Sequence, residues 1–378
     1  MRITSLRLRT FRNHDDTRIE FGGGINALIG RNGQGKTNIL EAVSYLSLGK
    51  SFFAALDAQV VQHNAPYFDV HASFISDSGR ETAASIVFAV QEGEKVVRIG
   101  GSPLEKVSAI VGEYPAVLLS PDHGGIVASG PAERRKFLDI MLCQTSVRYL
   151  NDLQEYRRIL RQRNRVLLDA RHHGGIDAGV LDPWTEALVE HGARIVQKRM
   201  ECVGFLQEPF MTAYTRLAGS AEPVQLLYAG IHGLTPGMDV RAIAALYREQ
   251  LHTHRHDEQR RGTTLVGPHR DDLEFLLRGM NAQDFASQGE HKTLLIALKS
   301  AELLYVRTVR NETPMLLLDD VFAELDSERA ARVLGQLQEN GQAILTATDA
   351  GLLAGDIAWD MHHRRFRIER GTCAPYTA

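Results

Sequence analysis

Two short stretches carry the residue types that hydrolysis of a nucleoside triphosphate requires. The first fits the phosphate-binding pattern G-x-x-x-x-G-K-[ST] at every required position. It consists of Gly30, Arg31, Asn32, Gly33, Gln34, Gly35, Lys36 and Thr37. Glycines let the backbone N–H groups turn towards the phosphates. The pattern assigns Lys36 to the β- and γ-phosphates, as a binding and catalytic residue, and the Thr37 hydroxyl to Mg²⁺. The alternative is a chance match in a glycine-bearing turn.

The second stretch is an apolar run over residues 313–318 that ends in Asp319 and Asp320. In phosphate-loop ATPases the first such aspartate holds Mg²⁺ through water, and the next acid can polarise the attacking water. We therefore predict Asp319 as a metal-binding residue and Asp320 as the catalytic carboxylate. The alternative is an ordinary strand that ends in an aspartate turn.

The flanking residues predict the elements that would position these groups. Residues 25–29 are apolar, as a buried strand requires, and Ile39, Val43 and Leu46 recur at helical spacing after the loop. Residues 343–348 predict a further buried parallel strand and residues 364–369 an edge strand. The sequence therefore predicts an α/β fold.

The composition is that of a soluble globular protein. The chain has 378 residues, 44% of them hydrophobic and 24% charged, with a net charge of −3. No apolar run approaches a membrane span, the N-terminus lacks a signal-peptide core, and the three cysteines are scattered. We expect a cytoplasmic protein with reduced thiols. The net charge disfavours nucleic-acid binding by overall charge but does not exclude a local basic patch.

The character of the chain changes at Pro121, where helical spacing replaces short strands. We assign residues 1–120 and 263–378 to one discontinuous ATPase head and residues 121–262 to a mostly helical inserted lobe. Residues 267–272, with the sequence Gly-Pro-His-Arg-Asp-Asp, are expected to form a hinge that returns the chain to the head.

One predicted helix of the inserted lobe is crowded with arginine. Its arginines are Arg157, Arg158, Arg161, Arg163, Arg165 and Arg171. DNA contact through Arg158, Arg161 and Arg165 is the functional interpretation, because arginines that neutralise phosphates release counterions. A solvated helix face is the alternative.

Two smaller motifs indicate the class of ATPase. Ser287, Gln288 and Gly289 precede a predicted helix and resemble the signature loop of ABC-type ATPases, which contacts the γ-phosphate of a partner's nucleotide. Asp326, in the sequence Glu-Leu-Asp, resembles the D-loop of the same class. A simple helix cap is the alternative for the serine loop. Four motifs in this order predict an ABC-type head that forms an ATP-dependent, head-to-tail homodimer.

The chain as a whole resembles the RecF family of bacterial DNA replication and repair ATPases. The resemblance rests on blocks from the first strand to about Thr348: residues 11–13, 120–122, 134–139, 161–164, 267–272 and 318–326. It implies an ABC-type head with a helical second lobe, a weak DNA-stimulated ATPase activity and binding to single-strand/duplex DNA junctions. It also implies cooperation with RecO and RecR in loading a recombinase, and a role in the SOS response.

The signature loop departs from the family pattern. Glu290 and His291 stand where the family has glutamine at both positions. A carboxylate beside a γ-phosphate would weaken binding unless its side chain points away.

Other classes share some of these motifs. An SMC/Rad50-type chromosome-structural ATPase would need very long heptad repeats, and Rad50 a zinc-binding C-x-x-C; neither occurs here. A transporter ATPase subunit would carry a fuller L-S-G-G-Q signature and associate with a membrane partner. A small GTPase is disfavoured because no N-K-x-D motif occurs.

Overall fold

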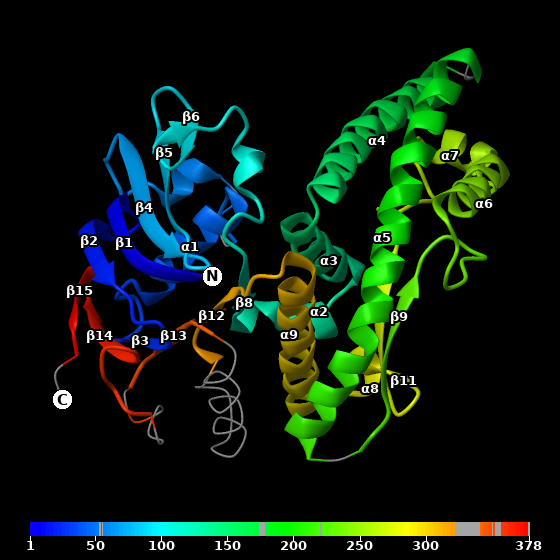
Figure 1. Cartoon of the computed structure of the whole chain (residues 1–378). Coiled ribbons are helices and arrows are strands. Elements are labelled where there is room, and N and C mark those ends of the chain that lie inside the picture. Colours follow the sequence, from blue (N-terminus) through cyan, green and yellow to red (C-terminus); the bar gives the residue numbers. More distant parts are fainter. Residues whose placement is uncertain are drawn as a thin grey trace. The chain divides into compact units, whose positions relative to one another are not determined.

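The chain divides into two compact units. The computed structural model describes residues 1–52, 54, 56–173, 178–219, 221–321, 341–349, 351 and 357–376. The first unit comprises Met1–His123 and Glu302–Ala378, and the second Gly124–Ala301 (Figure 1).

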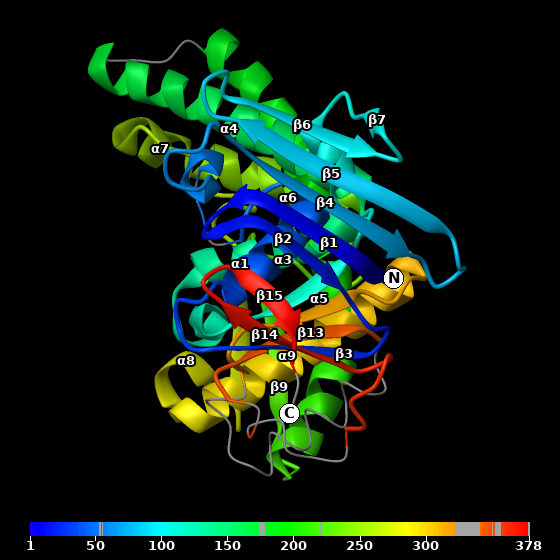
Figure 2. The ribbon, with the colours of Figure 1, turned by 90° about the vertical axis from the view of Figure 1, so that its left-hand side faces the viewer.

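One sheet of the first unit is antiparallel throughout. Its order is β2 (His14–Glu20), β1 (Arg2–Phe11), β4 (Tyr67–Ile75), β5 (Glu81–Ala89), β6 (Glu94–Ile99) and β7 (Ser102–Pro103). Figure 2 shows β1, β4 and β5 side by side. Buried and less buried residues alternate along β4, as expected for a sheet with one face on the core.

The other sheet carries the predicted nucleotide motifs. Its order is β15 (Thr372–Pro375), β14 (Arg364–Glu369), β3 (Ile25–Ile29), β13 (Ala343–Ala347), β12 (Met315–Leu318) and β8 (Ala116–Leu119). From β14 to β8 neighbouring strands are parallel. This confirms the predicted parallel strand at 343–348. Residues 364–369 do form a strand, but predicting it at the edge of the sheet was wrong, because β14 lies between β15 and β3. All five residues of β3 are buried, as the apolar run required.

Helix α1 (Lys36–Leu48) lies in the hydrophobic core between the sheets. Ile39, Val43 and Leu46 are fully buried, together with Leu28 of β3 and Phe68 of β4. Because the core fixes the start of α1, it also fixes the loop between β3 and α1. The first unit also contains short 3-10 turns at Asp57–Val60, Val107–Ile110 and Pro121–Gly124, the last of which runs one residue into the second unit.

Helices dominate the second unit. They are α2 (Gly125–Ala128), α3 (Pro131–Thr145), α4 (Val147–His173), α5 (Ala178–Ala218), α6 (Val240–Thr253), α7 (Arg255–Arg261) and α8 (Ala282–Phe285). Helix α9 (Gln288–Arg310) begins in this unit and ends in the first. Pro183 and Pro209 both lie inside α5.

A small antiparallel sheet in the second unit was not predicted. β9 (Val224–Ala229) pairs with β10 (Asp272–Leu277), which also pairs with β11 (Met280–Asn281). This pairing holds residues beyond 262 in the second unit, so the chain returns to the first unit at 301/302 and not at 262/263. The expected hinge at 267–272 is therefore wrong: this segment lies well inside the second unit. Within the described residues, no helix combines the length and apolar character that a membrane crossing requires.

Candidate nucleotide-binding site

The phosphate loop connects β3 to α1 with its outer residues exposed. Gly35 has φ of 108°, and a Cβ there would come within 2.5 Å of Asn13 Oδ1, so only glycine fits. The Lys36 ammonium donates to the carbonyl oxygens of Gly30 (2.6 Å) and Arg31 (3.1 Å). The Lys36 side chain thus lies along the phosphate loop.

Two β-turns distant in sequence support the loop from outside. After β1, Asn13 Nδ2 donates to Gln34 O at 3.1 Å, and His14 Nε2 lies 3.0 Å from Gly35 O. Between β14 and β15, Gly371 N donates to Gln34 O at 2.9 Å. We did not identify these supporting residues as site residues from the sequence, because the contacts join positions far apart in the chain.

The strand that carries the two aspartates lies two strands away from β3, with β13 between them. The Thr37 hydroxyl lies 2.9 and 3.0 Å from the two carboxylate oxygens of Asp319. Thr346 of β13 donates to Asp319 Oδ1 at 2.8 Å. Thr37 and Asp319 are therefore together, as their predicted shared role requires, and Thr346 is an addition to the site. Its place near the carboxyl end of a parallel strand is the signal that could have identified it.

Asp320 has an unusual backbone conformation. Its φ is 50°, a left-handed value that is costly for a residue with a side chain. The Asp320 N–H donates to Thr346 Oγ1 at 2.8 Å, which holds this conformation. The buried Oδ1 of Asp320 has no hydrogen-bond partner among the described residues. A carboxylate oxygen is thus kept available at the site.

Burial shifts the pKa values of the charged groups at this site. It lowers the pKa of Lys36 below its usual value, against the opposing influence of Asp320 and Asp319. Burial also raises the pKa of Asp319, although hydrogen bonds from Thr346 and Thr37 oppose that shift. Neither carboxylate forms an ion pair at close range with Lys36, so additional positive charge would be stabilised here.

The oxygen donors suit magnesium bound with a nucleotide. Mg²⁺ is held by one or two protein oxygens together with water and phosphate oxygens. The Thr37 hydroxyl and the Asp319 carboxylate supply such a pair. Over the described residues no cluster of three or more His, Cys, Asp or Glu side chains could hold a metal alone. The residues present therefore fit a metal that arrives with phosphate.

The signature residues lie in the second unit, at the start of α9. Ser287 is exposed, and its N–H and hydroxyl both donate to Glu290 Oε2, at 2.7 and 2.8 Å. Arg278 donates to the other oxygen of Glu290 at 2.8 Å. This is a reciprocal helix cap, and it lowers the pKa of Glu290 through the bonds from Ser287. Glu290 is therefore folded back on the serine that would meet a partner's phosphate. Asp326, the predicted D-loop residue, lies outside the described residues.

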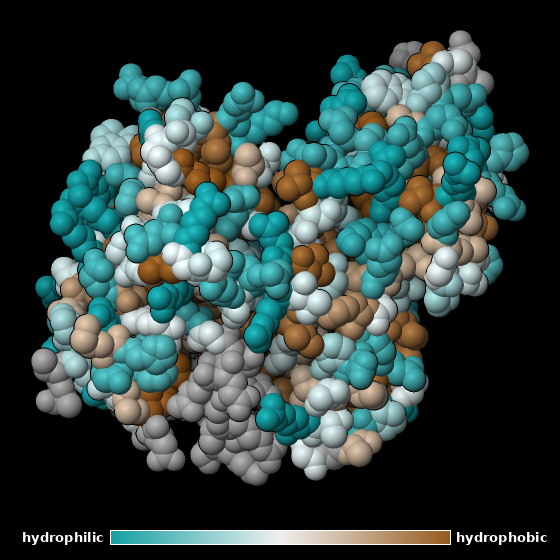
Figure 3. Space-filling model, in the orientation of Figure 1, coloured by the Kyte–Doolittle hydropathy of each residue, from teal (hydrophilic) through white to brown (hydrophobic). Residues whose placement is uncertain are grey.

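The arginines of α4 do not form one uniform charged face. Arg158, Arg161 and Arg165 are exposed, and Arg158 pairs with Glu155 at 2.9 Å. Arg163 is instead fully buried and paired with Glu258 at 2.6 Å, so including it in a solvated face was wrong. Figure 3 shows hydrophilic side chains over the part of the second unit that α4 forms. The three exposed arginines lie three and four residues apart, on one side of the helix.

A phosphate loop between a parallel strand and a helix, facing carboxylates at the end of a nearby strand, defines a P-loop nucleotide-binding site, and the likeness to known heads makes the fold that of an ABC-type ATPase head. The solved structure of an Smc head with the C-winged helix domain of ScpA shares this fold, with a TM-score of 0.54 and 15% identity over 99% of this chain and 96% of that chain. Residues 2–356 match the family model described as RecF/RecN/SMC N terminal domain.

More similar proteins narrow the family. The DNA replication and repair protein RecF of Chloroherpeton thalassium is 39% identical over 352 residues, covering 92% of this chain and 95% of the relative. The structure of the recombination mediator protein RecF with ATP, of the RecFOR pathway, has a TM-score of 0.90 and 29% identity, covering 99% of this chain and 97% of that chain. The chain belongs to the RecF family of DNA replication and repair proteins.

Proposed function

We propose that this chain binds and hydrolyses ATP with Mg²⁺, and that the ATP-bound form is a homodimer on DNA. The observation that carries this proposal is the meeting of Thr37, Asp319 and Thr346 beside the phosphate loop. The likeness to the ATP-bound RecF structure supports ATP as the nucleotide. In this proposal the DNA that the chain prefers is a single-strand/duplex junction. There the chain assists recombinase loading together with RecR and RecO, and so supports the SOS response.

Each residue of the site has a separate part in this chemistry. The loop N–H groups and Lys36 bind the phosphates, and Thr37 with Asp319 holds the metal. Bound Mg²⁺ supplies charge that neutralises the phosphate oxygens. Asp320 accepts a hydrogen bond from the attacking water through its available oxygen. Hydrolysis is weak and stimulated by DNA, so that it times residence on DNA.

The experiment that tests this function is self-association with ATP in the presence of DNA. We expect dimers with ATP and fewer with ADP, and more on a single-strand/duplex junction than on plain duplex of the same length. Monomers under all these conditions would contradict the proposal.

The partner's signature loop completes each ATP site of the homodimer. Ser287 is exposed, so its hydroxyl is accessible to the nucleotide of a partner. In the isolated chain, however, the Ser287 hydroxyl already donates to Glu290. Contact with the γ-phosphate in trans therefore competes with the helix cap.

Glu290→Gln should strengthen ATP-driven dimerisation. Glutamine retains the reciprocal cap but binds the Ser287 hydroxyl less tightly than a carboxylate. It also removes a negative charge close to the incoming γ-phosphate. We expect the dimer dissociation constant to fall by roughly tenfold, about 1.4 kcal/mol, in sedimentation equilibrium with ATP. ATP affinity of the monomer is the control and should not change. Equal or weaker dimerisation would show that Glu290 does not compete.

Replacing Arg158, Arg161 and Arg165 with alanine should weaken DNA binding without affecting ATP binding. Arginine binds phosphate oxygens bidentately, and log affinity falls with log salt by about 0.9 per duplex phosphate contacted. The triple variant should show a correspondingly smaller salt slope and a similar loss on unrelated sequences. Thermal unfolding checks the fold, because the arginine stems also pack. An unchanged slope in a well-folded variant would leave these residues as a solvated face.

A further inference from the structure

The second unit contains a cavity of about 200 Å³ whose lining is strongly cationic. It lies among α3, α4, α5 and the turn at residues 268–269. Its charged lining residues are Arg135, Lys136, Arg157, Arg199 and Asp139. Arg157 and Lys136 are exposed, so the cavity reaches the surface. Four of the lining residues are thus positively charged and one is a carboxylate, although Lys136 also pairs with Glu133 at 3.6 Å, outside the lining.

That carboxylate is fully engaged. Asp139 Oδ1 accepts hydrogen bonds from Arg199 (2.8 Å) and from the Tyr149 hydroxyl (2.6 Å), and Oδ2 accepts one from Arg157 (2.9 Å). Arg199 is also engaged, since it donates to Pro268 O at 2.6 Å and lies 3.3 Å from Asp271. Asp139 therefore has little capacity to neutralise a further cation.

Arg135 is the cation left without a counterion. Its guanidinium donates to the backbone oxygen of Asp271 at 2.7 Å and forms no ion pair with any described residue. Burial lowers the pKa of Arg135, and the neighbouring Arg199 lowers it further, against the opposing carboxylates Asp272, Asp271 and Asp139. A half-buried guanidinium in this position is stabilised by an oxyanion.

The neighbouring histidine adds no charge. Burial lowers the pKa of His269 to about 4, so the ring is neutral at pH 7. Its Nε2–H donates to Thr264 O (3.1 Å), and its Nδ1 accepts from the Tyr156 hydroxyl (2.7 Å). The positive character of the cavity therefore comes from the arginines and Lys136.

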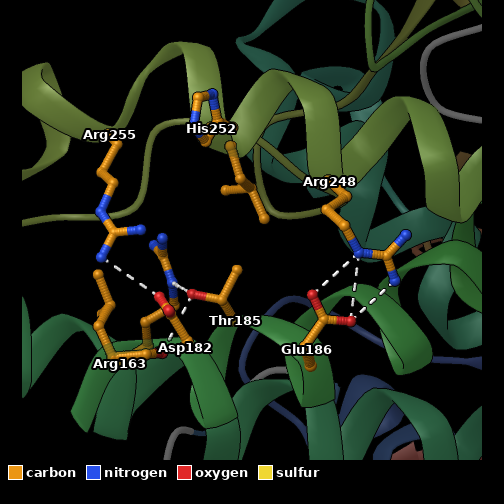
Figure 4. Close-up of a pocket in the computed structure, with 9 residues that line it drawn as sticks. Arg163, Asp182, Thr185, Glu186, Arg248, His252 and Arg255 are labelled. Atoms are coloured by element: carbon orange, nitrogen blue, oxygen red, sulfur yellow. Dashed lines mark hydrogen bonds and ion pairs between the residues drawn. The ribbon is translucent and has the colours of Figure 1, made fainter. Parts of the chain in front are cut away.

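A second cavity in the same unit provides a contrast (Figure 4). This cavity of about 210 Å³ is also lined by arginines, but each of them has a carboxylate partner. Arg248 lies 2.8 Å from Glu186, Arg255 lies 3.3 Å from Asp182, and Arg163 lies 2.6 Å from Glu258. The contrast between the two cavities is therefore Arg135, which lines the first cavity and forms no ion pair with a described residue.

We propose that the first cavity is a phosphate-binding site, in which Arg135 binds the oxyanion and Lys136 and Arg157 attract it at the mouth. The phosphate group comes either from the DNA backbone or from free phosphate. Only the DNA backbone as the source of the phosphate rests on the proposed function. Arg161 follows Arg157 by about one helical turn, so a DNA strand that runs along the exposed arginines of α4 would pass the mouth of the cavity.

Phosphate titration tests the site directly. Thermal unfolding is followed in inorganic phosphate at constant ionic strength for the wild type, Arg135→Gln, Ala132→Glu and Arg248→Gln. Ala132 lines the cavity in the first turn of α3, so the glutamate places a tethered carboxylate beside Arg135. We expect phosphate to raise the melting temperature of the wild type and of Arg248→Gln. Arg135→Gln and Ala132→Glu should lose this increase, and any general salt effect appears equally in all four.

Measuring DNA binding by the same variants identifies whether the phosphate group comes from DNA or from free phosphate. If the phosphate is that of DNA, Arg135→Gln and Ala132→Glu should reduce the salt slope by about 0.9 and leave ATP binding intact. If the slope is unchanged while the phosphate effect is lost, the ligand is free phosphate. Equal stabilisation of all four proteins by phosphate, with an unchanged slope, would overturn the site. If the wild type binds no DNA, the proposed function is wrong, but the phosphate titration still shows whether the cavity binds phosphate. If Arg135→Gln does not fold, Ala132→Glu carries the test.

Discussion

Lys36→Met should severely weaken ATP binding while leaving the protein folded. The Lys36 ammonium lies along the loop, donating to Gly30 O and Arg31 O, where it can reach the β- and γ-phosphates. Hydrogen bonds to charged groups contribute about 1.5–3 kcal/mol each, so losing contacts to two phosphates should weaken binding by at least on the order of a hundredfold. Equilibrium titration with a fluorescent ATP analogue measures this.

The stability of that variant is predicted by the same structure. Burial lowers the pKa of Lys36, which means that its charge is unfavourably solvated without a nucleotide. Methionine of similar length should therefore leave the melting temperature equal or higher. Arg31→Met, which removes an exposed charge from the same loop, is the matched control and should keep most of the affinity. Near-normal ATP affinity in Lys36→Met would refute the assignment of the loop.

Asp320→Asn should stop hydrolysis without preventing ATP binding. The side chain keeps its size, and asparagine tolerates the left-handed backbone that Asp320 adopts at φ of 50°. What is lost is a carboxylate able to polarise water, a role worth typically 10²–10⁴-fold in rate. The variant should accumulate as the ATP-bound dimer. Single-turnover hydrolysis together with sedimentation measures both effects.

Asp319→Asn provides the comparison for that experiment. It weakens a group that lies within 3.0 Å of the Thr37 hydroxyl and that we assign to Mg²⁺. ATP affinity itself should therefore fall, and should depend less on Mg²⁺. If Asp320→Asn hydrolyses ATP at the wild-type rate, another residue orients the water.

Local motifs predicted the parts of the site that are contiguous in sequence. Gly30–Thr37 and Asp319 each lie within one strand-and-turn segment, so spacing and flanking hydrophobicity were sufficient to predict that they follow buried strands; their roles with ATP stay predictions. Asn13, Gly371 and Thr346 reach the same site from distant positions. Thr346 could have been identified from its place near the carboxyl end of a predicted parallel strand. Nothing in the immediate neighbours of Asn13 and Gly371 distinguishes them from ordinary turn residues, and only the fold brings them to the loop.

Similar physical reasons explain the predictions that were wrong. The strands β9 and β10 are separated by α6 and α7, so their pairing could not be inferred from either segment alone. Arg163 is one of several arginines on a polar helix, and its burial depends on Glu258, which lies on α7. The departure at Glu290 was visible in the sequence. The direction in which the Glu290 side chain points could not be predicted, because it depends on Arg278 and on the cap with Ser287.

The claim that each ATP site is completed by the signature loop of a second chain is tested most directly by mixing two variants. Ser287→Arg keeps the phosphate loop but blocks the signature, and Lys36→Met keeps the signature but blocks the loop. Each alone should remain monomeric with ATP, whereas Ser287→Thr, which retains the hydroxyl and the cap, should dimerise. An equimolar mixture of the two blocked variants should form heterodimers in sedimentation equilibrium with ATP, because one composite site then has both parts intact. Dimerisation of Ser287→Arg alone with ATP would contradict the claim and leave the loop as a helix cap.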